Sequence, residues 1–427
     1  MNGVMMADLT PTPKTVEVKK AYQNIAFKLI DKDKGIVEIQ NKFFETNLRN
    51  FDFEWQLLEE GRIVQKGKTI VDLKPSEINT FELNGYDFPT ASLLECSLQI
   101  QAKIKATTNW ANAGHIVAWE EFNLKEVAHT LSNVSTKDKV SVKEIDKAVI
   151  ISFKSGKVVF DKELGRIKSF NQDGNSIIDG GMDLAFNRAY IDNDKRLNLR
   201  KSWDAIDFQN LLPNVDSFSV VKEKNRAIIQ LHKTYQSIGN TKGFKTEEQF
   251  IVYGNGLIDI KTSVSYVGKG EPITFPRIGY EVRVNKALNN SSWYGKGPGS
   301  SYKDRSTGMQ LGVYDATIDE HFVNYARPQE NGNKSEIRWG HVFKNDDHGV
   351  LFHSNKLLNF SFRKYTTEQL NNATHPYQLK ANDFNILNID FDHGALGNGS
   401  CGPIPMEKYY TDICDKSYYL RLHFNNN

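Results

Sequence analysis

The chain has 427 residues, of which 39% are hydrophobic and 25% are charged, the composition of a globular protein with room for two or three domains. Its 54 Lys and Arg residues nearly balance its 52 Asp and Glu residues, which excludes the strongly basic face that nucleic-acid-binding proteins need. No apolar run approaches the roughly 20 residues of a membrane-spanning helix, so we expect no contact with nucleic acid and no segment inside a bilayer.

Residues 1–21 have the character of a linker. Pro11 and Pro13 favour extended backbone at the residues before them, and the charged residues 15–21 could form a turn or two of helix. A secretory signal has a basic stretch, then an apolar stretch, then a cleavage site of small residues, and this segment has none of the three. Because it does not look like a first strand either, we expect another domain to precede it.

Residues 22–125 are predicted to form a small antiparallel β-sandwich of immunoglobulin type. Apolar and polar residues alternate in GIVEIQNKF, and Phe51, Phe53, Trp55 and Leu57 share one face of the next strand. Residues 59–62 carry a hairpin signal, and two more alternating runs follow. The three cysteines lack metal-ligand spacing and are interpreted as free or buried thiols: Cys96, Cys401 and Cys414.

Residues 126–139 are polar and without periodicity, which predicts a second linker. From residue 140 to residue 427 the strand pattern resumes and continues, so we expect one large antiparallel double sheet with long binding loops. The exception is a possible short helix over residues 366–373, where Thr366 is a plausible N-cap.

Four stretches carry the motifs of a known family. They are residues 21–61 together with WANAGHIVAWEEFNL; residues 158–170 together with AFNRAYIDNDK; the group PRIGYEV, WYGKGPGSSYKDRSTGMQLGVY and YARPQENGNKSEIRWGHV; and LNIDFDHGALGNGSCGP. In this order they resemble the C-terminal half of a family 2 glycoside hydrolase, a β-galactosidase. The resemblance covers nearly the whole chain. It implies an all-β protein with an immunoglobulin-like sandwich followed by a galactose-mutarotase-like β-supersandwich.

The resemblance also assigns the start of the chain. Asn2-Gly3 and the DLTPTP run that ends at Pro13 look like the exit from the family's catalytic (β/α)₈ barrel. Retaining glycosidases use two carboxyl groups about 5–5.5 Å apart, and the family carries both on barrel strands. We therefore assign no catalytic residue here and expect the chain alone to be inactive. The implied partners are a galactoside, a barrel portion on the same or another chain, and a second copy in a homo-oligomer.

Two places are implied to face the sugar or its cations. Asn2 aligns with a residue whose amide oxygen would bind sodium near the galactose, and sodium and magnesium are cofactors of the complete enzyme only. In the flexible loop over residues 394–403, Asn398, Ser400 and Cys401 are implied to line the edge of the substrate pocket. Many members have a tryptophan at the last of these positions, so stacking on the sugar is not expected from Cys401.

Other polar groups have plainer interpretations. Four close carboxylate pairs are expected to be solvated turn residues: Asp31/Asp33, Asp192/Asp194, Asp346/Asp347 and Asp390/Asp392. In residues 327–339, Arg327 and Arg338 are expected to pair with carboxylates such as Glu330 and Glu336 in a buried network.

Two other functions stay open on the sequence alone. A carbohydrate-binding module could display Trp293, Tyr294 and Tyr302 as a surface platform for sugars, and a purely structural or oligomerisation unit would need no ligand. Mutarotase activity is not expected, because no acid/base pair of His and Glu is evident at matching positions.

Overall fold

The computed structural model describes residues 3–196, 198–270, 274–344, 348–397, 402–412 and 416–424. Its strands are β1 (Ile25–Asp31), β2 (Ile36–Asn41), β3 (Phe51–Glu59), β4 (Arg62–Thr69), β5 (Ile78–Glu82), β6 (Cys96–Ile104), β7 (Ile116–Lys125), β8 (Ser141–Ile145), β9 (Ala148–Phe153), β10 (Gly156–Asp161), β11 (Arg166–Gln172), β12 (Asn175–Ala185), β13 (Leu212–Lys222), β14 (Arg226–Gln236), β15 (Gly243–Tyr253), β16 (Ile258–Val267), β17 (Arg277–Asn285), β18 (Asn290–Gly297), β19 (Gln310–Thr317), β20 (Lys334–Phe343), β21 (Gly349–Arg363), β22 (Phe384–His393) and β23 (Lys416–His423). Its α-helices are α1 (Lys14–Ala21), α2 (Asp192–Arg196), α3 (Asn198–Asp204), α4 (Ile318–His321) and α5 (Thr367–Asn372).

The first seven strands form a small sandwich of two sheets, ordered β1-β2-β5 and β4-β3-β6-β7. The predicted alternation is confirmed, because Phe51, Phe53, Trp55 and Leu57 are all buried in its core. The hairpin over residues 59–62 is confirmed as well, with Glu59 opposite Arg62. These features are those of an immunoglobulin-like domain.

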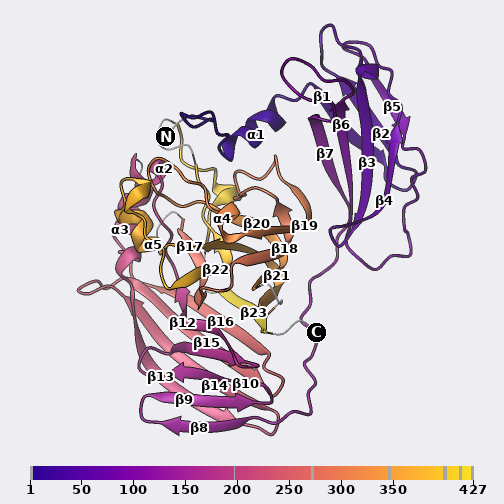
Figure 1. The fold of residues 1–427 in the computed structure, drawn as a ribbon. Coiled ribbons are helices and arrows are strands. Elements are labelled where there is room, and N and C mark those ends of the chain that lie inside the picture. Colours follow the sequence, from indigo (N-terminus) through magenta and orange to yellow (C-terminus); the bar gives the residue numbers. More distant parts are fainter. Residues whose placement is uncertain are drawn as a thin grey trace.

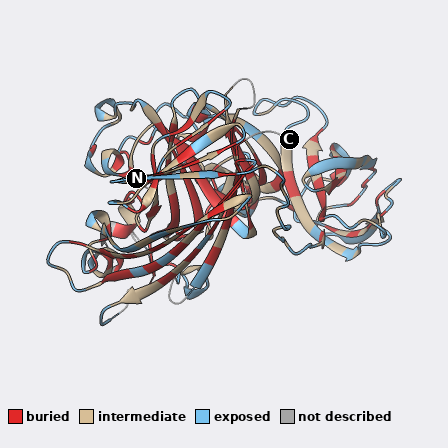
Figure 2. Cartoon of the chain, turned by 90° about the horizontal axis from the view of Figure 1, so that it is seen from below, coloured by how far each residue is buried: buried red, intermediate tan, exposed pale blue. Residues whose placement is uncertain are grey.

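The remaining strands form a single sheet of 16 strands around one large core (Figures 1 and 2). Its main path runs β13-β14-β15-β16-β23-β21-β22-β17-β12-β11-β10-β9-β8, with β18, β19 and β20 beside it. Buried residues alternate along strands such as β14, as one covered sheet face requires. The all-β prediction of a small sandwich followed by a supersandwich is therefore confirmed. The exact domain boundaries stay a prediction.

The short helices were partly foreseen. Helix α1 lies within the predicted segment, and Thr366 caps α5 by accepting a hydrogen bond from the backbone of Gln369 at 3.1 Å. The helical turns α2, α3 and α4 were not predicted. Each is too short to show a 3.6-residue apolar stripe. No helix in the described ranges is long and apolar enough to cross a membrane.

After β7 the chain runs along the outside of the large sheet and enters it at β8 (Figure 1). The two parts touch through polar side chains. Glu95, just before β6, accepts hydrogen bonds from Arg338 Nε at 2.9 Å, Arg338 Nη2 at 2.5 Å and the Tyr294 hydroxyl at 2.6 Å. Of the two glutamates expected to pair with Arg338, Glu336 lies 4.0 Å from its Nη1, whereas the pairing with Glu330 is wrong, since the main partner of Arg338 is Glu95 of the small sandwich.

A glycine fixes the second contact between the parts. Gly61 has φ +74°, and a Cβ there would lie 2.6 Å from the ring of Tyr294, so the hairpin turn packs directly on that ring. Nearby, Glu121 of β7 pairs with Lys296 at 2.7 Å and accepts the Leu311 backbone hydrogen bond at 2.6 Å. The interface thus relies on buried carboxylates of the small sandwich that meet cations of the large sheet.

We predict that Glu95→Gln separates the two parts of the molecule. The substitution removes the two-point partner of the buried Arg338 guanidinium and leaves only the partly exposed Glu336, 4.0 Å away; breaking such a pair typically costs about 3 kcal/mol or more. Protease cleavage between residues 126 and 140 should accelerate, measured as the rate of appearance of the two fragments.

The control is Glu54→Gln, which alters a more exposed pair with Lys68 and Lys103 inside the small sandwich. Equal cleavage rates for the two variants would contradict the prediction.

Candidate functional site

A cluster of buried charged side chains lies where β17 and β22 end. Arg277 on β17 and Asp390 on β22 form a two-point ion pair, with Arg277 Nε 3.1 Å from Asp390 Oδ1 and a second contact between Nη2 and Oδ2. Both side chains are fully buried. Gly279 makes this possible, because a Cβ there would lie 2.5 Å from Asp390 Oδ1.

A second buried pair lies beside the first. Arg188, three residues after β12, binds both carboxylate oxygens of Asp194 in α2, with Nη1 2.8 Å from Oδ2 and Nη2 3.0 Å from Oδ1. Asp194 also accepts the Ile191 backbone hydrogen bond at 2.8 Å, which holds the first turn of α2. The interpretation of Asp194 and Asp390 as solvated turn residues is wrong: burial makes each a partner of an arginine.

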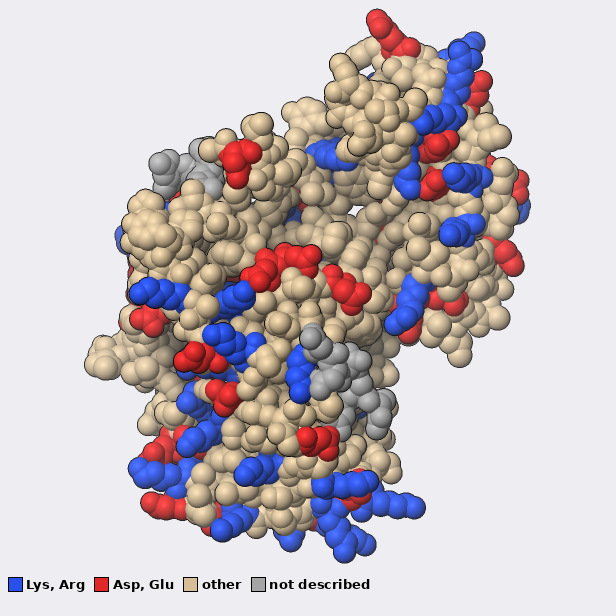
Figure 3. Space-filling model, in the orientation of Figure 1, with Lys and Arg blue, Asp and Glu red and all other residues tan. Residues whose placement is uncertain are grey.

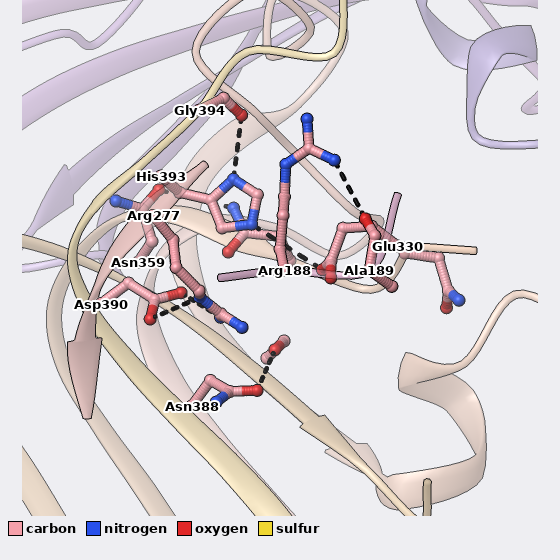
Figure 4. A network of polar contacts seen from close by, with 12 residues as sticks. Arg188, Ala189, Arg277, Glu330, Asn359, Asn388, Asp390, His393 and Gly394 are labelled. Carbon is pink, nitrogen blue, oxygen red and sulfur yellow. Dashed lines mark hydrogen bonds and ion pairs between the residues drawn. The ribbon is translucent and has the colours of Figure 1, made fainter. Parts of the chain in front are cut away.

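Glu330 lies between these pairs (Figure 4). Unlike the aspartates of those two pairs, it makes no two-point contact with an arginine of the described residues. His393 Nε2 lies 3.8 Å from its Oε1, and Arg363 Nη1 lies 4.0 Å from its Oε2. These ion pairs are longer than hydrogen bonds, and neither carboxylate oxygen accepts a hydrogen bond from the described residues. His393 Nδ1 donates to the Gly394 carbonyl at 2.9 Å, which turns Nε2 toward Glu330.

The charges of the cluster balance. Three guanidinium groups, Arg188, Arg277 and Arg363, face three carboxylates, Asp194, Asp390 and Glu330. Burial alone would raise the pKa of Glu330, but His393, Arg363 and Arg277 together lower it to about 2. Glu330 is therefore an ionised counter-charge at neutral pH and cannot serve there as a protonated general acid.

A cavity of about 570 Å³ opens beside this cluster. Its wall includes Glu330 and Tyr302 together with residues 191–193, 304–305 and the two ends of the loop that was predicted to face the sugar, at residues 396–397 and 403–406. The aromatic ring of Tyr302 is 2% exposed, and Trp293 and Tyr294 are also buried. The interpretation of these three rings as a surface platform is therefore wrong.

Two consecutive residues hold the segments around that loop. Asp304 accepts the backbone hydrogen bonds of Leu396 at 3.0 Å and Gly397 at 2.7 Å, which fixes the first end of the loop. Lys303 pairs with Asp392 at 2.6 Å, just before the loop, and donates to the Tyr410 carbonyl at 3.3 Å, beyond its second end. The segments that lead into and out of the loop are therefore joined to each other through Lys303.

The residues that sequence reasoning placed nearest the sugar, Asn398, Ser400 and Cys401, lie outside the described residues, as does Asn2, and so do Asp346 and Asp347. Asp31 is a turn residue as predicted, because it accepts the backbone hydrogen bonds of Asp33 and Lys34. Arg327 is exposed and not part of a buried network. Within the described ranges, no three His, Cys, Asp or Glu side chains are grouped to hold a metal ion.

Comparison with known proteins decides the family. A family model described as the β-galactosidase small chain matches residues 152–423, and one described as β-galactosidase domain 4 matches residues 37–125. The chain belongs to the β-galactosidase small-chain family. The predicted resemblance is thereby confirmed, and this chain is a partial segment of a β-galactosidase.

Individual β-galactosidases match over nearly the whole chain. The enzyme of Priestia megaterium is 27% identical over 98% of this chain, and that of Streptococcus thermophilus is 27% identical over 98%. The chain spans about 40% of the length of each of these curated relatives. Among solved structures, a galactose 1-epimerase from Lactobacillus acidophilus NCFM aligns with a TM-score of 0.36 at 9% identity, covering 68% of this chain and 99% of that one.

We predict that Glu330→Gln destabilises this β-galactosidase segment in a pH-dependent way. Because the pKa of Glu330 lies below its ordinary value of 4.5, its ionised form stabilises the fold above that pH and loses the effect as the pH falls toward 2. The shift corresponds to a stability loss on the order of 3 kcal/mol at neutral pH.

Denaturant unfolding at several pH values should show the variant and the parent converging as the pH falls. Glu82→Gln, at an exposed position of β5, is the control and should follow the parent throughout. A constant difference between Glu330→Gln and the parent across the acid range would contradict the assigned charge state.

We also predict that Asp304→Ala releases one end of the loop. Loss of the carboxylate that binds the Leu396 and Gly397 amides should increase their hydrogen exchange by about tenfold or more, while core strands stay protected. The control is Asp315→Ala on the exposed part of β19. Unchanged exchange at both amides would show that Asp304 does not anchor the loop.

Proposed function

We propose that this chain is the part of a retaining β-galactosidase that forms one wall of the galactoside site, while the two catalytic carboxylates lie on another part of the enzyme. The observation that carries the proposal is the anchored loop. Its ends line a cavity of about 570 Å³, Asp304 ties its first end, and Lys303 joins the segments before and after it. Such a rigid wall is what a substrate pocket requires from a supporting domain.

The charge state of the buried cluster is consistent with a structural, non-catalytic role for its three carboxylates. Asp194 and Asp390 are neutralised by two-point contacts to arginines, and Glu330 is held ionised. A retaining mechanism needs one carboxyl group that is protonated and one that is free to attack. None of these three buried carboxylates suits either task.

The contacts with substrate and cations complete the proposal. Asn398, Ser400 and Cys401 are proposed to border the bound galactoside, since the residues that flank them line the cavity. Asn2 is proposed as a sodium ligand of the complete enzyme through its amide oxygen. The partner is proposed to be the barrel-bearing portion, and subunit contacts within a homo-oligomer are also proposed.

Activity measurements test whether the catalytic carboxylates lie outside this chain. The purified chain alone should not hydrolyse a nitrophenyl β-galactoside above the uncatalysed rate. Mixing it with the separately purified N-terminal three-fifths of a β-galactosidase, itself inactive, should generate turnover that depends on the concentration of both parts.

Asp304→Ala should raise the KM of the mixture more than it lowers kcat, because the loop positions substrate and takes no part in bond cleavage. Hydrolysis by the chain alone at an enzymatic rate would overturn the proposal. The stand-alone alternative, a sugar-binding module, would instead show binding of galactose or lactose to the chain without any partner.

A further inference from the structure

The small sandwich has a second cavity, of about 860 Å³, at the end where α1 meets it. Its floor is apolar and consists of residues at the open end of the two sheets: Phe43, Phe51, Ile104 and Val117. Its walls come from three connecting segments, residues 22–24, 46–50 and 105–115. Loops that cluster at one end of an immunoglobulin-like sandwich are a common place for a binding site.

An exposed indole forms one wall. Trp110 is 64% exposed, although a side chain of its size is usually covered. Its loop is rigid: Thr108 Oγ1 accepts the backbone hydrogen bonds of Trp110 at 3.4 Å and Ala111 at 3.2 Å, and the ring of His115 packs edge-on against the indole at 5.7 Å. Tyr22, 80% exposed, faces the same cavity. Rigid aromatic faces of this kind bind the C–H surface of a ring-shaped ligand with little loss of entropy.

The rim is polar and carries an excess of positive charge. Lys19, Arg49 and Lys105 all line the cavity, and none of its lining residues is Asp or Glu. Lys19 donates to His115 Nε2 at 3.0 Å rather than to a carboxylate. The guanidinium of Arg49 has no hydrogen bond or ion pair with the described residues, and Lys105 lies 4.0 Å from its nearest acidic partner, Asp52. On the face seen in Figure 3, positive and negative side chains lie interspersed over most of the surface.

We propose that this cavity binds an acidic oligosaccharide, with a sugar ring on Trp110 and its carboxylate at Arg49 and Lys19. The aromatic wall suits the ring, and the amides of Asn24 and Asn50 suit its hydroxyl groups. The acid-free cationic rim selects an anionic ligand over a neutral one. The lining comes from three connecting segments and not from an exposed strand edge, so a short glycan fits the cavity better than an extended peptide. This site is independent of the galactoside wall.

Titration of the full chain with digalacturonic acid tests the proposal by calorimetry and by Trp fluorescence. Saturable binding is expected, weakened by added salt, whereas lactose at the same concentrations should give no detectable heat. Trp110→Ala should weaken binding about tenfold, measured by heat alone. Arg49→Gln should weaken binding of the acid to a similar extent.

Two variants are matched controls: Tyr377→Ala removes an exposed ring from the turn between α5 and β22, and Arg62→Gln removes an exposed guanidinium from the other end of the small sandwich. Both should bind like the parent. The proposal fails if no heat is detected, if lactose binds as tightly as the uronate, or if an acidic hexapeptide binds more tightly. Because these measurements use the chain alone and no hydrolysis, their failure leaves the proposed galactoside wall unaffected.

Discussion

The large sheet is organised around a neutral cluster of buried charges. Three arginines and three carboxylates cancel one another at the ends of β12, β17, β21 and β22, and removing any one member would leave a bare charge in a low-dielectric interior. Pairing in two-point geometry fixes distance and angle, which simple apolar packing does not. The segments that continue beyond those strand ends therefore start from fixed positions. These segments form the cavity wall, so the position of the wall is fixed as well.

Glu330 is the exception within this cluster, and its position explains why. It belongs to the irregular segment between α4 and β20 and faces His393 and Arg363 at ion-pair distances, with no hydrogen bond to either oxygen from the described part of the chain. Against the opposing effect of burial, its pKa is kept low chiefly by His393, with Arg363 and Arg277 adding to the effect. The same residue contacts the cavity, so the charge balance of the interior extends to the edge of the proposed substrate site.

The strands and turns could be predicted from the sequence, because the alternation of apolar and polar residues is a local signal. The faces of β2 and β3, the hairpin at Gly61 and the cap at Thr366 each depend on residues within a few positions of one another. The candidate site could be predicted only as a set of motifs, without the contacts between residues that are distant in the sequence. Glu95 and Arg338 are separated by 243 positions, so nothing local links them, and Arg338 was assigned to nearby glutamates instead.

The burial of Asp194 and Asp390 was not evident from the sequence. The partner of Asp390, Arg277, lies 113 positions away, whereas Arg188 lies only six positions from Asp194, in an irregular segment without the spacing of a helix or strand.

The route between β7 and β8 has a consequence for how the two halves hold together. Residues 126–140 contribute no strand or helix, whereas Glu95, Glu121 and the turn at Gly61 each contact the large sheet directly. Covalent continuity therefore acts mainly as a tether that raises the effective concentration of one half for the other, and the side chains set their orientation. The path of this tether is itself guided by the large sheet, since Arg421 donates to the Ser132 carbonyl at 2.8 Å and Asn225 donates to the Thr136 carbonyl at 3.0 Å.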